Sequence, residues 1–184
     1  MKRVARKLCV AAWHPSGEML DLGCGRGEWL ELASENGFTA EGVDLNAIMV
    51  AECKGRGFPI TDDALEYLRS LPAKSRGVIT AFHLIEHLEF RMLVELLRES
   101  LRVLRPDGLA IFETPNPDNV LVGSNRFHSD PTHRHPLPKE YTSFLLRSVG
   151  FTDVVIRPLH PDKDSLLNDG EAMPSSFPRF TFRA

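Results

Sequence analysis

The sequence of 184 residues has few cysteines, no excess of positive charge and no long apolar run. The three cysteines, Cys9, Cys24 and Cys53, contain no C-x-x-C pair and no regular spacing. This pattern excludes a disulfide framework and indicates a reducing, cytoplasmic location. Lysines and arginines total 22 against 25 aspartates and glutamates, which gives a net charge of −3. That balance makes nucleic acid an unfavourable partner, because proteins that bind a phosphate backbone are normally basic.

The longest apolar stretch near the start covers only residues 8–13. A signal peptide needs about 7–15 apolar residues and a membrane span about 20, so neither is expected. We instead predict a short helix with a basic outer face over residues 1–16. The length allows one domain over 1–184, with a core at 17–157 and a tail at 158–184.

Apolar runs alternate with amphipathic segments through the core, which predicts an α/β fold with a mostly parallel sheet and helices on both faces. We predict strands at 19–22, 39–44, 58–60, 78–82, 109–112, 151–156 and 177–183. We predict helices at 28–36, 47–54, 62–71, 90–104 and 138–149. Ligands bind such sheets at the carboxyl ends of the strands. Functional residues are therefore expected in the loops at 23–28, 44–46, 61–64, 83–87 and 113–137.

The first predicted strand ends in the turn Gly23-Cys24-Gly25-Arg26-Gly27, and a helix follows it. Such a turn lets backbone approach a ligand, and the helix start offers free N–H groups. Asp44 ends the second strand about twenty residues later, where an acidic side chain can accept hydrogen bonds from ribose hydroxyls. Together they predict a nucleoside pocket. The glycine spacing differs from the Gly-x-Gly-x-x-Gly of dinucleotide-binding proteins, which disfavours a pyrophosphate ligand.

These residues resemble the first motif of the class I S-adenosylmethionine-dependent methyltransferases, and the similarity continues along the chain. Residues 42–44 match the ribose-binding strand end, 63–65 the adenine-contacting segment and 104–108 the turn before the fifth strand. The resemblance implies a Rossmann-like, doubly wound, seven-stranded sheet whose last strand is antiparallel. It also implies S-adenosyl-L-methionine as the cofactor.

The resemblance also implies roles for individual residues. Gly23, Gly25 and the Cys24 backbone would line the methionine part, Asp44 would hold the ribose, and Asp63 would face the adenine amine. Asp21 suits the cationic methionine amine, since opposite charges attract. The predicted cofactor-binding residues are Asp21, Gly23, Cys24, Gly25, Asp44, Leu45, Asp63, Ala64, Phe82 and His83.

Residues 83–87 contain H-x-x-E-H, the signature of inverted zinc proteases. That site needs both histidines on one helix, whereas His83 directly follows a predicted strand, so a protease is disfavoured. The segment resembles the loop after the fourth strand of ubiquinone-biosynthesis O-methyltransferases and small-RNA 2′-O-methyltransferases, in which acidic and histidine side chains can hold a divalent ion. His83 stands where those families usually have glutamate. We assign no metal ligand, and Glu86 and His87 are polar loop residues or candidate bases.

Residues 114–138 hold five of the thirteen prolines and three of the seven histidines, and we expect a long, structureless, functional loop there. The segment is similar to bacterial methyltransferases of O-antigen and other cell-surface polysaccharide biosynthesis. That similarity implies O-methylation of a sugar hydroxyl or terminal phosphate on a glycan or glycolipid precursor. Histidine is a suitable base near neutral pH. We predict His133 as the leading catalytic base and His87 as the second.

Other functions fit the same pattern. The acceptor could be a small molecule of the quinol type or an RNA 2′-hydroxyl, although the net acidity disfavours RNA. From other classes, a nicotinamide-dependent oxidoreductase and a catalytically silent cofactor-binding module use comparable sheets.

Overall fold

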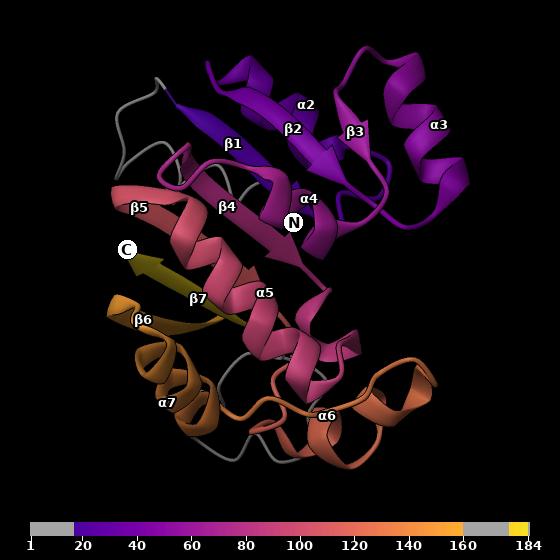
Figure 1. The fold of residues 1–184 in the computed structure, drawn as a ribbon. Coiled ribbons are helices and arrows are strands. Elements are labelled where there is room, and N and C mark those ends of the chain that lie inside the picture. Colours follow the sequence, from indigo (N-terminus) through magenta and orange to yellow (C-terminus); the bar gives the residue numbers. More distant parts are fainter. Residues whose placement is uncertain (1–16, 160–176, 184) are drawn as a thin grey trace.

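The computed structural model describes residues 17–159 and 177–183, in which strands alternate with helices (Figure 1). The strands are β1 (Glu18–Leu22), β2 (Thr39–Val43), β3 (Ile60–Thr61), β4 (Arg76–Phe82), β5 (Leu104–Glu113), β6 (Thr152–Leu159) and β7 (Phe177–Arg183). The α-helices are α2 (Glu28–Glu35), α3 (Ala47–Gly55), α4 (Ala64–Ser70), α5 (Phe90–Val103), α6 (Val120–Ser124) and α7 (Lys139–Val149). Two 3-10 helices are η1 (Ile85–His87) and η2 (Arg126–Ser129). The predicted helix over 1–16 and most of the predicted tail lie outside the described residues.

The strands form one sheet in the order β3-β2-β1-β4-β5-β7-β6. Strands β1 to β5 pair in parallel, and β7 runs antiparallel to both of its neighbours. The predicted α/β class and parallel arrangement are therefore confirmed. The chain moves outward from β1 to β3 and then returns to pair β4 with the other side of β1. A ligand site is expected at this point, where the order of the strands reverses.

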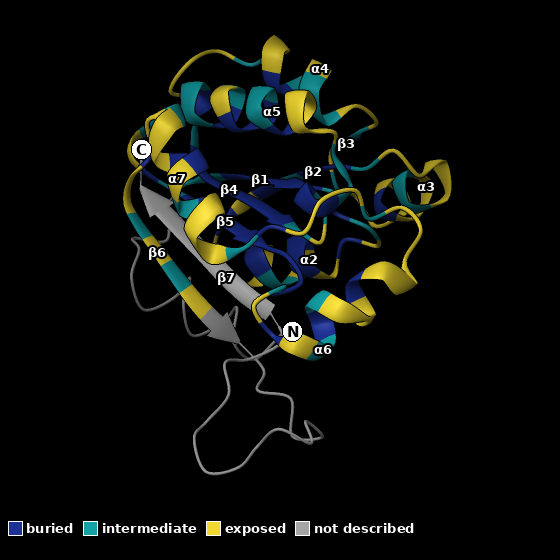
Figure 2. Cartoon of the chain, turned by 90° about the horizontal axis from the view of Figure 1, so that it is seen from below, coloured by how far each residue is buried: buried dark blue, intermediate teal, exposed yellow. Residues whose placement is uncertain are grey.

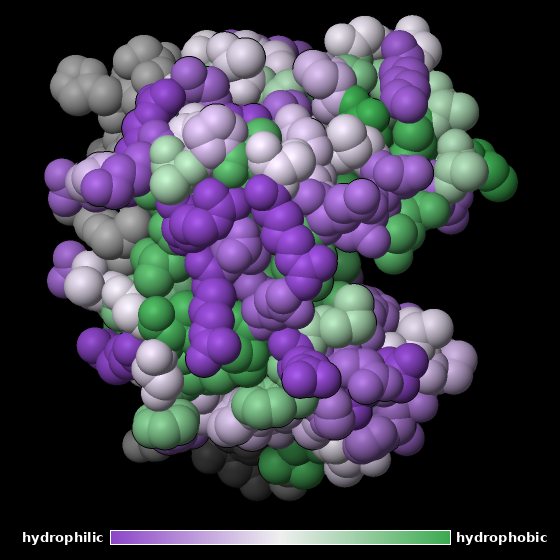
Figure 3. All heavy atoms as spheres, in the orientation of Figure 1, coloured by the Kyte–Doolittle hydropathy of each residue, from purple (hydrophilic) through white to green (hydrophobic). Residues whose placement is uncertain are grey.

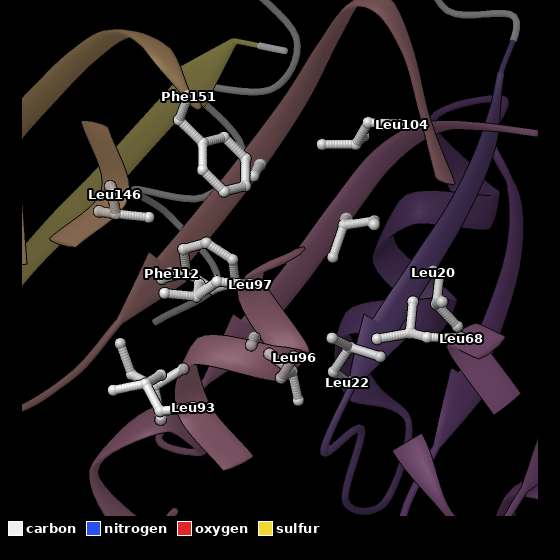
Figure 4. Packing of buried hydrophobic residues seen from close by; sticks show 14 of the residues in the cluster. Leu20, Leu22, Leu68, Leu93, Leu96, Leu97, Leu104, Phe112, Leu146 and Phe151 are labelled. Carbon is white, nitrogen blue, oxygen red and sulfur yellow. The ribbon is translucent and has the colours of Figure 1, made fainter. Parts of the chain in front are cut away.

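Alternating side chains of the central strands form a core on each face of the sheet. Leu20 and Leu22 belong to the cluster under α4, α5 and α7, whereas Met19 belongs to the cluster under α2. Figure 2 shows α4, α5 and α7 on one face and α2 on the other. Figure 4 shows the first cluster continuing from β1 to the aromatic ring of Phe112, which contacts Phe151 edge to face with the centroids 6.4 Å apart.

Local signals explain most of the helices. The Asn46 side chain accepts a hydrogen bond from the Ile48 amide and begins α3. In α5 the buried leucines recur at the three- and four-residue spacing that predicts a core-facing helix, with Leu93, Leu96 and Leu97 all buried.

Two predicted loop segments are wrong in part. Residues 105–108, expected to be a turn, fall within the bounds of β5 but have no partner in β4; they bulge between the pairs Arg76–Leu104 and Val78–Leu109, with Asp107 at a φ of 64°. Residues 114–138, expected to be structureless, contain α6 and η2. The side chain of Asn119 accepts hydrogen bonds from the amides of Leu121 and Val122 and so caps α6. The prolines around this short helix concealed it in the sequence. Within the described ranges, the structure contains no helix that is both long and apolar enough to cross a bilayer.

Gly123 provides a test of how closely α6 packs on the preceding turn. A Cβ at Gly123 would lie 2.4 Å from the carbonyl oxygen of Pro117, whereas a Cβ at Gly55, the last residue of α3, would meet open space. We expect Gly123→Ala to lower the free energy of unfolding by about 1–3 kcal/mol through this clash. The control Gly55→Ala should leave it unchanged or raise it by up to about 1 kcal/mol. Chemical denaturation measures both, and equal stabilities would contradict the packing.

Candidate functional site

The glycine turn after β1 folds back over the end of β2. The amides of Gly23 and Cys24 both donate to the carbonyl oxygen of Val43, at 2.8 and 2.9 Å. The amide of Gly25 donates to Asp44 Oδ2 at 2.8 Å. Gly23 and Gly25 have φ angles of 73° and 54°, a region that side chains with a Cβ rarely adopt. The turn is therefore fixed to β2 by three backbone donors.

A cavity of about 180 Å³ opens beside this turn. The predicted residues Gly23, Asp44, Leu45, Asp63 and Ala64 all line it. The rest of its lining consists of Val43, Asp62, Leu65, Leu84, Leu88, Met92 and Leu96. Figure 3 shows the surface hollowed by a notch between the regions of α3 and α6. The cavity joins an acidic rim to an apolar wall, which suits a flat apolar ring attached to a hydroxyl-bearing group.

Sequence reasoning missed the apolar wall of the cavity. Leu84 and Leu88 come from the loop around η1, and Met92 and Leu96 from α5. These four residues lie four positions apart in the sequence, a spacing that could have indicated a shared face. Only Met92 and Leu96 lie in α5, however, so one helix does not explain the spacing. Only the crossing from β4 back over the sheet places these residues opposite the glycine turn.

Asp63 and Cys24 each have a structural contact in the described fold. Asp63 is exposed, and its Oδ1 accepts a hydrogen bond from the Glu66 amide and begins α4. The Cys24 side chain is buried beneath the turn against Gly42, where an added Cβ would lie 2.7 Å from Sγ. Burial raises the pKa of this thiol. Cys24 and Cys53 are both buried free thiols, so neither forms a disulfide.

Asp21 lies fully buried near the end of β1, beneath the turn. The hydroxyl of Thr80 donates to Asp21 Oδ1 at 2.6 Å, and the indole of Trp29 donates to Thr80 Oγ1 at 3.1 Å. Burial raises the pKa of Asp21 to about 7, opposed by the hydrogen bond from Thr80. The carboxyl group is therefore poised to lose or gain a proton near neutral pH. Thr80 and Trp29 were not identified from the sequence, because neither type marks a site by itself.

His83 follows β4 and turns toward two buried carboxylates. Its Nδ1 lies 3.2 Å from Glu86 Oε1, and its Nε2 lies 3.9 Å from Glu113 Oε1. The hydrogen bond to Glu86 is the main cause that raises the pKa of His83. Neither His83 nor Phe82, whose ring edge packs on Trp29 5.3 Å away, is part of the described cavity lining. Their role in cofactor binding stays a prediction.

The two predicted bases, His87 and His133, come together although 45 residues separate them. Their ring centroids are 4.8 Å apart. The amide of Arg134 donates to the carbonyl oxygen of Glu86 at 2.8 Å and so joins the two loops. His133 Nδ1 lies 2.7 Å from the carbonyl oxygen of Phe127. Since a carbonyl only accepts, Nδ1 carries the proton and Nε2 has a free lone pair.

Glu86, His87 and His133 could also hold a divalent cation. Each offers one ligand atom, and these atoms lie within 4.8 Å of one another. Glu86 is fully buried, and its Oε2 has no hydrogen-bond partner. Two imidazoles and a carboxylate suit zinc and related ions. The sequence did not assign this set, because His133 comes from a distant loop.

Comparisons with known proteins also indicate a methyltransferase. A family profile described as a methyltransferase domain matches residues 2–155. A probable S-adenosylmethionine-dependent methyltransferase of Mycolicibacterium smegmatis is 30% identical over 136 residues, which are 73% of this chain and 51% of that protein. A probable S-adenosylmethionine-dependent methyltransferase of Mycobacterium tuberculosis is 30% identical over 141 residues, 76% of this chain and 50% of that protein. The chain therefore spans about half the length of these curated relatives.

A solved structure is also similar over the whole chain. It is a SAM-dependent methyltransferase from Archaeoglobus fulgidus, with a TM-score of 0.85 and 29% sequence identity. The match covers 100% of this chain and 92% of that one.

The contact between His83 and Glu86 predicts a pH-dependent contribution to stability. A histidine whose pKa is raised by folding stabilises the fold fully below its unfolded pKa, near 6.5, and this contribution disappears as the pH rises through the folded value. We expect His83→Gln to be less stable than the parent at pH 5.5 and the difference to shrink above pH 7. Urea denaturation across this range measures it, with the exposed His135→Gln as control. A difference that is constant with pH would contradict the ion pair.

Proposed function

The chain belongs to the methyltransferase domain family, and the two mycobacterial relatives named above are probable S-adenosylmethionine-dependent methyltransferases. We propose that it transfers a methyl group from S-adenosyl-L-methionine to a hydroxyl group. The observation that carries the proposal is that the glycine turn and Asp44 meet at one cavity. The turn provides backbone that a ligand can approach closely, Asp44 provides a carboxylate suited to ribose, and the leucines and Met92 provide an apolar wall.

The residues at the cavity fit this cofactor better than a dinucleotide. Its described lining contains Asp44, Asp62 and Asp63 and no lysine or arginine. Three carboxylates would repel a pyrophosphate, whereas a cofactor without phosphate and with a sulfonium charge suits them. This argues against the nicotinamide-dependent oxidoreductase. When bound, the cofactor supplies an electrophilic methyl group at its sulfonium.

Each part of the cavity then has a role in holding the cofactor. Asp44 would accept hydrogen bonds from the ribose hydroxyls, and the wall formed by Leu84, Leu88 and Met92 would pack on the adenine. The turn would let the methionine part lie close to the backbone. Asp21, which is buried and outside the cavity lining, would contribute the negative charge of its ionised form to the methionine amine.

The acceptor lies at the histidine pair. His133 Nε2 would take the proton of the acceptor hydroxyl, whose oxygen would receive the methyl group that the cofactor supplies. The acceptor would leave as a methyl ether or ester, the cofactor as S-adenosylhomocysteine, and the proton would remain on His133. A sugar hydroxyl or terminal phosphate of a glycan precursor is the proposed acceptor. The sequence resemblance to polysaccharide-biosynthesis enzymes supports that choice, as does the polar, exposed segment around Asp130 and Thr132.

Replacement of His133 tests the catalytic proposal. We expect His133→Ala to bind S-adenosylhomocysteine like the parent in titration calorimetry, while methyl transfer falls by about 10²–10⁴-fold through loss of the base. Transfer is measured with labelled cofactor and pools of nucleotide sugars, lipid-linked glycans, quinols and RNA. The exposed His128→Ala is the matched control. Unchanged transfer would remove His133 from the mechanism.

The same assay separates a base from a metal ligand. If a chelator abolishes transfer and a divalent ion restores it, His133 and His87 act as ligands with Glu86 and not as bases. If the protein binds NAD and not S-adenosylhomocysteine, the methyltransferase proposal fails.

The raised pKa of Asp21 leads us to expect that cofactor binding depends on pH. Its pKa of about 7 means that the carboxyl is mostly protonated below neutrality, and a cationic amine beside it favours the charged form. We therefore expect the affinity for S-adenosylhomocysteine to increase as the pH rises from 5.5 to 7 and then to level off. Asp21→Asn should bind more weakly and remove this increase. Calorimetry at several pH values measures both, and an equal slope in the two proteins would contradict the role of Asp21.

A further inference from the structure

A short hydrogen-bonded chain leads from Asp130 to His87. Asp130 Oδ1 accepts from the Thr132 amide at 2.8 Å and lies 2.6 Å from Thr132 Oγ1. The same hydroxyl oxygen lies 2.8 Å from His87 Nδ1. Asp130 and Thr132 are both exposed, and neither contributes to the core. Their contacts therefore concern the position of His87 more than the stability of the fold.

The count of protons fixes the direction of the two hydrogen bonds. A carboxylate only accepts, so the single hydroxyl proton of Thr132 points to Asp130. The hydroxyl can then only accept from His87, whose proton must be on Nδ1. Donation by Thr132 to His87 instead would leave two acceptor oxygens 2.6 Å apart with no proton between them. His87 therefore donates to Thr132, and Thr132 donates to Asp130.

The result matches the state of the neighbouring histidine. His133 also carries its proton on Nδ1, through the carbonyl oxygen of Phe127, so both rings keep Nε2 unprotonated. Asp130 Oδ2 lies 3.9 Å from His133 Nε2. This separation is too long for a hydrogen bond, so of the two rings the Asp130 carboxylate is hydrogen-bonded toward His87 alone, through Thr132.

We propose that Asp130 and Thr132 are positioning residues that hold His87, whose ring lies beside that of His133, in the Nδ1-protonated tautomer, so that its Nε2 is free to accept a proton as the second base. The proposal rests on the methyltransferase function proposed above. Among the described residues, the titratable groups next to His87 include Glu86 of its own loop and Asp130 and His133 of the facing segment. Asp130 and Thr132 touch no reacting atom and act through His87.

The tautomer itself can be measured without any acceptor. Protein labelled with ¹⁵N-histidine at pH 8 gives two-bond ¹H–¹⁵N correlations that show which ring nitrogen carries the proton, and His87→Gln identifies the signal of His87. We expect the Nδ1-protonated pattern in the parent and in Thr132→Ser, and a mixed or Nε2-protonated pattern in Thr132→Val. An Nε2-protonated His87 in the parent would overturn the proposal.

Kinetics test whether the tautomer matters for transfer. We expect Thr132→Val to lower kcat by about tenfold or more, since it misorients a proton-accepting group, with KM and the affinity for S-adenosylhomocysteine unchanged. Thr132→Ser should restore kcat. Ser129→Ala, which removes a hydroxyl from the same segment, is the control. Parental kcat in Thr132→Val would overturn the proposal.

The two proposals fail in different ways. If the parent binds no S-adenosylhomocysteine and transfers no methyl group, the proposed function fails, while the histidine spectra still report the tautomer. If the parent is active but His87 and kcat do not respond to Thr132→Val, only the positioning role fails.

Discussion

The hydrogen bonds between the glycine turn and the end of β2 are the constraint on which the rest of the site depends. Val43 accepts two turn amides through its carbonyl oxygen, and Asp44 accepts a third through its side chain. A turn that gives its N–H groups to a neighbouring strand needs left-handed φ angles, and glycine provides them at Gly23 and Gly25. The same bonds direct Asp44 toward the cavity and begin α3, since its second oxygen accepts from Asn46.

One short loop connects the two halves of the site. Leu84 lies against Gly23 on the cofactor side, where an added Cβ would come within 3.4 Å of it. Three residues later, His87 faces His133 on the acceptor side. The loop around η1 therefore sets the distance between the proposed cofactor pocket and the proposed base. A change in this loop should alter both halves at once, because only two residues separate Leu84 from His87.

A contact between one histidine and two buried carboxyl groups holds that loop in place. Glu86 and Glu113 are both inaccessible, and a buried polar group without a partner is costly. His83 Nδ1 lies 3.2 Å from Glu86 Oε1, and His83 Nε2 lies 3.9 Å from Glu113 Oε1. The backbone hydrogen bond from Arg134 to Glu86 joins this loop to the histidine segment.

The sequence by itself determined the α/β class, the turn at Gly23 and the pairing of that turn with Asp44, because these depend on local conformation and short spacing. It also identified His87 and His133 as candidate bases, from residue type, from their position in predicted loops and from the resemblance of those loops to known methyltransferases. Only the tertiary structure decided that their rings meet, that His83 faces two carboxylates, and that Leu84 and Met92 complete the cavity. Thr132 had no signal at all. Such contacts join segments far apart in the chain, and their distances follow from how the loops cross the ends of the strands.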